Sequence, residues 1–119
     1  YFSNRKLSRG KWLSLNEMTY TDPTGRKRKW ELVKRTTKQP GTVDAVGIIA
    51  IIKRLLKYDC IVLVRQYRPP MRACTIEFPA GLVDPAESTE TCAVRELKEE
   101  TGYTGVVKHS SPGIYNYSF

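Results

Sequence analysis

Polar and apolar residues alternate along the first third of the chain. Residues 11–20 place Trp12, Asn16 and Met18 on one face of an extended segment, which is typical of a β-strand. A turn follows at Asp22-Pro23-Thr24-Gly25, and residues 28–37 predict the returning strand. We therefore expect a β-hairpin over residues 11–37, whereas residues 1–10 are polar and predicted to be irregular.

Continuous apolar runs replace this alternation in the middle of the chain. Residues 43–53 and 60–66 are rich in β-branched side chains, which predicts buried central strands. Arg68-Pro69-Pro70 predicts an extended exit from the second run, because the residue before proline disfavours the helical region. Short strands are expected at residues 75–78 and 103–109.

One amphipathic helix is predicted after these strands. Ser88 is a candidate N-cap, and Gly102 stands where a left-handed residue would end the helix. Asp84 and Glu87 form a competing capping box that would start the helix four residues earlier. Many strands and one helix favour an α/β (mixed α+β) fold, and a mixed sheet with a single helix would be an incomplete domain.

Composition narrows the function classes. The chain has 119 residues, enough for one small domain, and a net charge of +8, which suits an anionic ligand. Its basic residues are scattered, so we expect no nucleic-acid partner, and no apolar run is long enough to cross a membrane. Three cysteines without a CxxC spacing argue against a disulfide framework or a zinc site and favour a reducing compartment: the cytoplasm, with the nucleus as a second location.

Three carboxylates cluster on the predicted helix. Glu96, Glu99 and Glu100 lie at positions i, i+3 and i+4, where like charges repel each other. A hard divalent cation such as Mg²⁺ would reverse this repulsion, since it prefers oxygen ligands. A solvent-facing charged helix is the alternative that the spacing alone leaves open.

The segment that contains these carboxylates, GLVDPAESTETCAVRELKEETGY at residues 81–103, resembles the Nudix box of the Nudix hydrolases. Every fixed position of the pattern is met, and Tyr103 departs from it where an aliphatic residue is usual. The resemblance implies that Glu96, Glu99 and Glu100, together with the backbone carbonyl of Ala80, bind Mg²⁺, with Mn²⁺ as an alternative. It also implies that Arg95 is an ion-pair partner that orients the carboxylates.

The flanking stretches, residues 10–37, 60–71 and 75–82, are similar to the ADP-sugar (ADP-ribose) pyrophosphatase branch of that family. This implies an α/β/α sandwich with a mixed sheet over residues 44–119, preceded by a hairpin over residues 1–43 that is exchanged in a homodimer and contributes to adenine binding. The implied substrate-binding residues are Trp12, Trp30, Glu31, Arg35, Arg68, Glu77 and Leu82. The two tryptophans would sandwich the adenine, and the arginines would contact the diphosphate and adenosine side.

The expected activity is Mg²⁺-dependent hydrolysis of ADP-ribose and related ADP-sugars to AMP and a sugar phosphate. The family's general base is a glutamate expected after Phe119, so the chain resembles a C-terminally truncated member. The alternatives are a truncated, catalytically inactive nucleotide-binding or dimerising form, and a Nudix hydrolase acting on oxidised nucleoside diphosphates.

Overall fold

The computed structural model describes residues 3–37 and 43–114 and divides into two compact units, Tyr1–Thr42 and Val43–Phe119. The division falls one residue before the boundary expected from the sequence. Each unit is described on its own.

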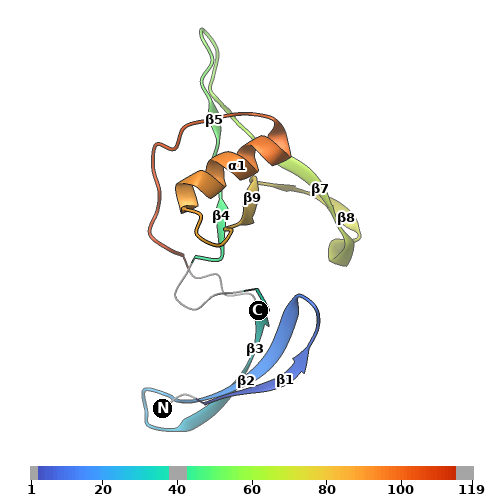
Figure 1. Ribbon diagram of the computed structural model, residues 1–119, viewed down its shortest axis with the longest axis vertical. Coiled ribbons are helices and arrows are strands. Elements are labelled where there is room, and N and C mark those ends of the chain that lie inside the picture. The colour runs from blue at the N-terminus through green and yellow to red at the C-terminus, as the bar shows by residue number, and fades with distance from the viewer. Residues whose placement is uncertain (1–2, 38–42, 115–119) are drawn as a thin grey trace. The chain divides into compact units, whose positions relative to one another are not determined.

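The first unit is a three-stranded antiparallel sheet of β1 (Ser3–Arg9), β2 (Leu13–Thr21) and β3 (Lys27–Arg35), in that order (Figure 1). The β2–β3 hairpin confirms the prediction, and Asp22 closes its turn. One oxygen of that carboxylate accepts hydrogen bonds from the backbone N–H groups of Thr24 and Arg26, both at 2.9 Å. The other accepts one from Nε of Arg28 at 3.0 Å.

The prediction of an irregular segment is wrong for residues 3–9, which form strand β1, whereas residues 1–2 lie outside the described part of the chain. This edge strand pairs with β2 through its backbone, while every one of its side chains is exposed. No buried face imposes an alternation of polar and apolar residues, so the sequence pattern carried no strand signal.

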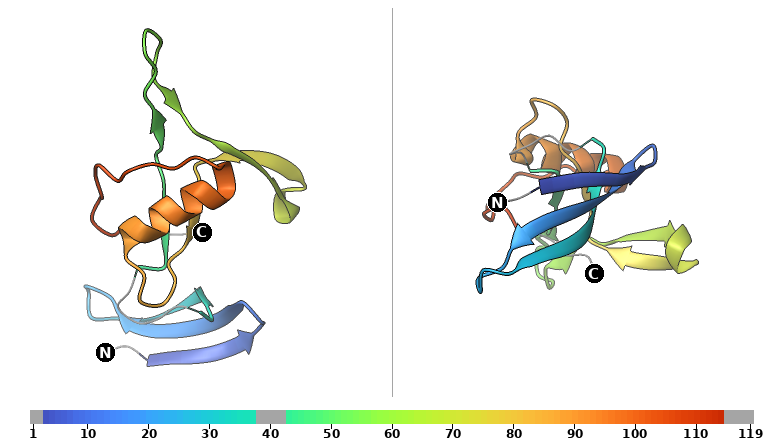
Figure 2. Two further views of the ribbon diagram at one scale, coloured as in Figure 1. Left: turned by 45° about the horizontal axis from the view of Figure 1, so that its top comes forward. Right: turned by 90° about the horizontal axis from the view of Figure 1, so that it is seen from below.

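Over residues 43–114, the part of the second unit that the structure describes, the chain forms six short strands and one α-helix. The strands are β4 (Ala45–Gly47), β5 (Ile51–Ile52), β6 (Cys60–Ile61), β7 (Val64–Arg68), β8 (Ala73–Glu77) and β9 (Ala80–Leu82). They pair antiparallel as β4–β9, β5–β6 and β7–β8. The β5–β6 hairpin projects away from the helix, and the β7–β8 hairpin extends in another direction (Figures 1 and 2).

The two apolar runs do not form continuous buried strands, contrary to prediction. Within residues 43–53 the chain changes partner: the N–H of Ile48 donates to the carbonyl of Pro79, and the carbonyl of Ala50 accepts from the N–H of Val62. Residues 60–66 likewise divide between β6, which pairs with β5, and β7, which pairs with β8. Ile49 and Ile51 are more than half exposed.

The helix, α1, spans Thr89–Thr101 and lies against β4 and β9 (Figures 1 and 2). Ser88 is its N-cap, with Oγ accepting from the N–H of Thr91 at 3.1 Å, and Gly102 adopts a left-handed φ of 76° after its last turn. Both caps confirm the sequence prediction, and the alternative start at Asp84 is wrong. The described hydrophobic core is small and centres on Cys92 and Leu97 of this helix.

Two further expectations are corrected. Residues 69–71 form a turn of 3₁₀-helix, Pro69–Met71, instead of continuing extended, because proline is well tolerated in the first turn of a helix. Residues 103–109 run without strand pairing.

Candidate functional site

The three candidate metal-binding carboxylates of α1 point in different directions: those of Glu96 and Glu100 point toward β9, and that of Glu99 points toward solvent. Glu100 accepts a hydrogen bond from the backbone N–H of Ala80 at 3.2 Å. The Glu96 carboxylate lies directly over Gly81, whereas the Glu99 side chain is largely exposed. Two of the three predicted residues, Glu96 and Glu100, therefore reach the backbone of β9, which carries the Ala80 carbonyl that the family resemblance implies as a metal ligand.

Gly81 leaves the space in which Glu96 sits. A Cβ at Gly81 would lie 1.8 Å from Cδ of Glu96 and 2.0 Å from its Oε1. This distance is far below a van der Waals contact, so any side chain at position 81 would displace the carboxylate.

Arg95 holds the carboxylates and the loop before the helix together. Its Nε and Nη2 donate to the two carboxylate oxygens of Glu87 at 2.9 and 2.8 Å, and Nη1 donates to Oε1 of Glu96 at 2.8 Å. Nη1 also reaches Glu99 at 3.5 Å, and Nη2 donates to the carbonyl of Leu82 at 3.1 Å. These contacts with Glu87 and then Glu96 raise the pKa of Arg95. The hydrogen bond from Arg95, supported by one from the Asp84 N–H, lowers the pKa of Glu87 to about 2.

A buried thiol joins the same backbone group. Sγ of Cys92 contacts the carbonyl of Leu82 at 3.3 Å, and burial raises the pKa of Cys92 to about 11. The thiol therefore stays protonated at neutral pH and donates to the carbonyl. Leu82 is thus fixed through its main chain by two side chains of α1, and its own side chain is exposed.

Arg68 and Glu77 form a second polar pair across the β7–β8 hairpin. Nε and Nη2 of Arg68 donate to the two oxygens of Glu77 at 2.8 and 2.5 Å. The hydroxyl of Thr75 also donates to Glu77. The hydrogen bond from Arg68, followed by the one from Thr75, lowers the pKa of Glu77 to about 2. The hydrogen bond to Glu77 is the largest cause that raises the pKa of Arg68, and the negative charge of Glu100 adds a smaller effect.

The donor chemistry of this region fits a hard divalent cation. Among the described residues, no three acidic, histidine or cysteine side chains already converge on one point. Glu96 and Glu100 nevertheless both reach β9, and the missing Cβ at Gly81 provides the cradle for one of them. Carboxylate and carbonyl oxygens are the ligands that Mg²⁺ and Mn²⁺ prefer.

Four predicted substrate-binding residues lie in the first unit, and the sheet separates them. Trp30 is opposite Met18 in the β2–β3 register, and the carbonyl of Trp12 accepts from the N–H of Thr36. Six residues of strand therefore separate the backbone positions of the two tryptophans, about 20 Å. Glu31 follows Trp30 and so points to the other face of the sheet, opposite Glu17.

Arg35 is the fourth of these residues and stands at the far end of β3, opposite Leu13. One copy of the sheet therefore keeps the four side chains apart.

Comparison with known proteins decides the family. The NUDIX domain family matches residues 41–117. The chain belongs to the Nudix family. It is 47% identical over 112 residues to ADP-sugar pyrophosphatase of Mus musculus, covering 94% of this chain and 51% of that protein. It is 45% identical over 113 residues to ADP-ribose pyrophosphatase of Saccharomyces cerevisiae, covering 94% and 49% respectively.

The crystal structure of an ADP compounds hydrolase superposes with a TM-score of 0.66 at 27% identity, covering 86% of this chain and 50% of that one. Together with the family match, this confirms the predicted α/β Nudix fold. The chain spans about half the length of the curated relatives it matches.

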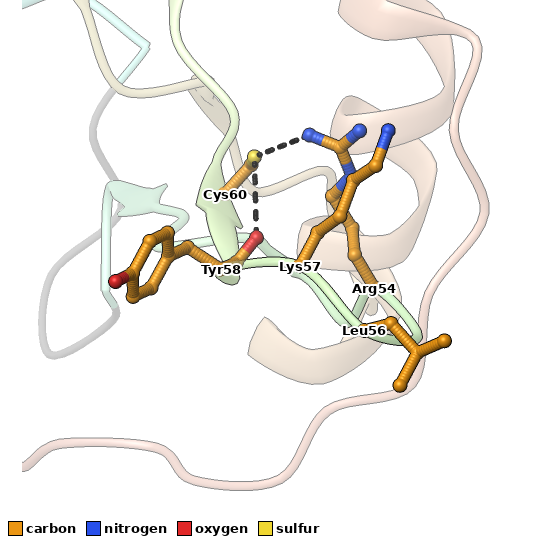
Figure 3. A pocket seen from close by; sticks show the side chains of 5 residues that line it. All are labelled: Arg54, Leu56, Lys57, Tyr58 and Cys60. Atoms are coloured by element: carbon orange, nitrogen blue, oxygen red, sulfur yellow. Dashed lines mark hydrogen bonds between the residues drawn. The ribbon is translucent and has the colours of Figure 1, made fainter.

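One open concavity lies along the segment that links β5 to β6. Arg54, Leu56, Lys57, Tyr58 and Cys60 line it, with a volume of about 720 Å³ (Figure 3). Arg54 approaches Sγ of Cys60 at 3.4 Å, and none of the predicted site residues takes part. Among the described residues, no helix is both long and apolar enough to span a membrane.

Sequence reasoning missed the structural partners of the site. The pairing of Glu87 with Arg95 crosses the helix N-cap, so no helical periodicity reveals it. Thr75 gives only a weak signal, two positions before Glu77 on the same strand face. Gly81 belongs to the Nudix pattern, but only the structure gives the reason a glycine is needed there.

Proposed function

We propose that this Nudix chain hydrolyses the diphosphate of ADP-ribose and related ADP-sugars, releasing AMP and a sugar phosphate. The observation that carries the proposal is the Nudix helix seated on β9, with Glu96 over Gly81 and Glu100 on the Ala80 amide. The names of the relatives from mouse and yeast support the substrate class.

The residues that would hold Mg²⁺ or Mn²⁺ are Glu96, Glu99, Glu100 and the carbonyl of Ala80. When bound, the metal supplies charge neutralisation for the diphosphate and lowers the pKa of a coordinated water. Arg95 keeps the carboxylates beside the strand, since it bonds Glu87 on one side and Glu96 on the other.

Arg68 is proposed to position the diphosphate. A guanidinium has five N–H donors, and two of those on Arg68 are used by Glu77, so three remain for phosphate oxygens. Glu77 and Thr75 fix the plane of the guanidinium, which reduces the entropy lost on binding. Arg35 of the first unit is proposed to contact the same anionic substrate.

A homodimer with exchanged hairpins is proposed because one sheet cannot form the adenine site alone. Two rings stacked on opposite faces of one purine lie much closer than the 20 Å or so between Trp12 and Trp30 of one copy. Trp12 of one copy and Trp30 of the other would satisfy this spacing, whereas the side chain of Glu31 faces away from Trp30 and is not part of the stacked arrangement. Leu13 and Val33, both more than half exposed, give the sheet apolar surface that a second copy would cover.

The three free cysteines support a reducing compartment, and we propose the cytoplasm with the nucleus as a second location.

The deciding assay measures AMP release from ADP-ribose with Mg²⁺ and with a chelator, using oxidised guanine nucleoside diphosphates as competitors. Chelator-sensitive release that these competitors leave unaffected is the expected result. AMP binding without turnover would favour a catalytically inactive nucleotide-binding form, and the assay would then be repeated on a chain extended past Phe119. Glu100→Gln should lower turnover by orders of magnitude while AMP still binds, and near-normal turnover would refute the metal-site assignment.

A further inference from the structure

Lys11 covers one face of Trp12. Its ammonium nitrogen lies 4.7 Å from the centroid of the indole ring, within the range of a cation–π interaction. Trp12 itself is 63% exposed, so the rest of the indole remains accessible. Among the described residues, no cation lies over the ring of Trp30 in the same way.

The backbone around this pair is held at the end of the hairpin. Thr36 fixes it twice: its hydroxyl donates to the carbonyl of Lys11 at 2.8 Å, and its N–H donates to the carbonyl of Trp12 at 2.9 Å. The N–H of Gly10 donates to the carbonyl of Leu13 at 2.8 Å. The main chain that carries Lys11 and Trp12 is therefore fixed on both sides, even though both side chains are exposed.

We propose that Lys11 is a positioning residue that occupies one face of the Trp12 indole, so that a nucleotide base stacks on the opposite face. The inference rests on the proposed function, because it takes Trp12 as a base-stacking residue. A ring held by a cation loses less freedom when a base stacks on it, and the occupied face cannot take up the base in an unproductive arrangement.

This role makes a selective prediction about ligands. Lys11 acts on the indole, so its removal should weaken ligands that contain the base and spare ligands that contain only sugar and phosphate. A cation–π contact at an exposed site corresponds to about a two- to fivefold change in affinity. A general electrostatic role would instead weaken both kinds of ligand equally.

The experiment measures binding by isothermal titration calorimetry, and its parent is the unmutated chain, which keeps both Trp12 and Trp30. The parent, Lys11→Met and Lys11→Arg are each titrated with AMP and with ribose 5-phosphate. Lys27→Met, at the start of β3, removes the same charge elsewhere and is the matched control. We expect Lys11→Met to weaken AMP binding about two- to fivefold without changing ribose 5-phosphate binding, and we expect Lys11→Arg to restore it.

The outcomes separate the two proposals. If AMP binds the parent and Lys11→Met leaves the affinity for AMP unchanged, the inference is refuted and the proposed function stands. Equal weakening of both ligands, or equal weakening by Lys27→Met, also refutes it, since the effect would then be one of charge alone. If AMP does not bind the parent at all, the proposed function fails, and the inference fails with it.

Discussion

Replacing Gly81 by alanine tests whether the proposed metal site depends on the position of the Glu96 carboxylate over Gly81. The added Cβ would lie 1.8 Å from Cδ of Glu96, whereas carbon atoms in contact are about 3.5–4.0 Å apart. The carboxylate must therefore move by roughly 2 Å. Gly81 is not among the described glycines with positive φ, so the backbone accepts alanine.

The same geometry predicts that function and stability will respond differently. The obstructing atoms are the end of a flexible side chain, so the unfolding free energy should fall by no more than about 0.5–1.5 kcal/mol, the scale of a strained rotamer. A misplacement of about 1 Å in a catalytic group can cost about 100-fold in rate. We therefore expect a loss of ADP-ribose turnover of about 100-fold or more, and Mn²⁺ affinity weakened at least about tenfold.

Gly47→Ala is the matched control. Gly47 lies on β4 directly opposite Ala80 of β9, and a Cβ there meets no atom within 4 Å. Mn²⁺ binding is measured by electron paramagnetic resonance and unfolding by circular dichroism, so the test does not depend on turnover. Equal Mn²⁺ affinity in the two variants would refute the reasoning, as would a large loss of stability in Gly81→Ala alone.

Three further predictions concern other groups. Interactions with Thr24 first, then Arg26, lower the pKa of Asp22 from 3.8 to about 2, so its stabilisation of the hairpin is complete above about pH 4 and is lost as the pH falls through about 2. Asp22→Asn should remove this acid limb from a melting curve, and an unchanged limb would assign it to other carboxylates. Glu77→Gln should raise KM for ADP-ribose about tenfold with a smaller effect on kcat, since a looser Arg68 mainly weakens binding; a selective fall in kcat would argue against this role. Cys92, whose pKa is raised to about 11 by burial, should react with iodoacetamide at pH 8 far more slowly than exposed Cys74, which mass spectrometry of labelled peptides would show; equal rates would contradict the burial.

The sequence predicted the structural features that depend only on neighbouring residues, such as the two ends of α1 and the turn at residues 22–25. Ser88 and Gly102 act within one turn of the helix ends, so both limits of α1 could be read from the chain. The Asp22–Gly25 turn is likewise closed by groups within six residues of one another. Strand limits in the second unit could not be predicted this way, because they depend on distant partners such as Pro79 for Ile48.

The candidate site shows the same difference between local features, which the sequence predicts, and contacts with distant residues, which it does not predict. The carboxylates of α1 were predicted from spacing and family pattern, since both are contained in one helix. Neither the hydrogen bond from the Ala80 N–H to Glu100 nor the one from Arg95 to Glu87 follows from helical periodicity, because each joins the helix to a residue outside it. Tertiary packing alone determines them.

Strand β9 explains how so small a core can support an ordered site. Each of its three residues contacts a polar side chain of α1. The N–H of Ala80 donates to Glu100, and the Glu96 carboxylate lies over Gly81. The carbonyl of Leu82 accepts hydrogen bonds from Arg95 and Cys92. The opposite side of the strand is fixed by its ladder with β4. Main-chain groups have no side-chain rotamers to lose, so each of these contacts costs only the rotamer entropy of the α1 side chain. The order of the site therefore depends on the β4–β9 ladder more than on the extent of the hydrophobic core.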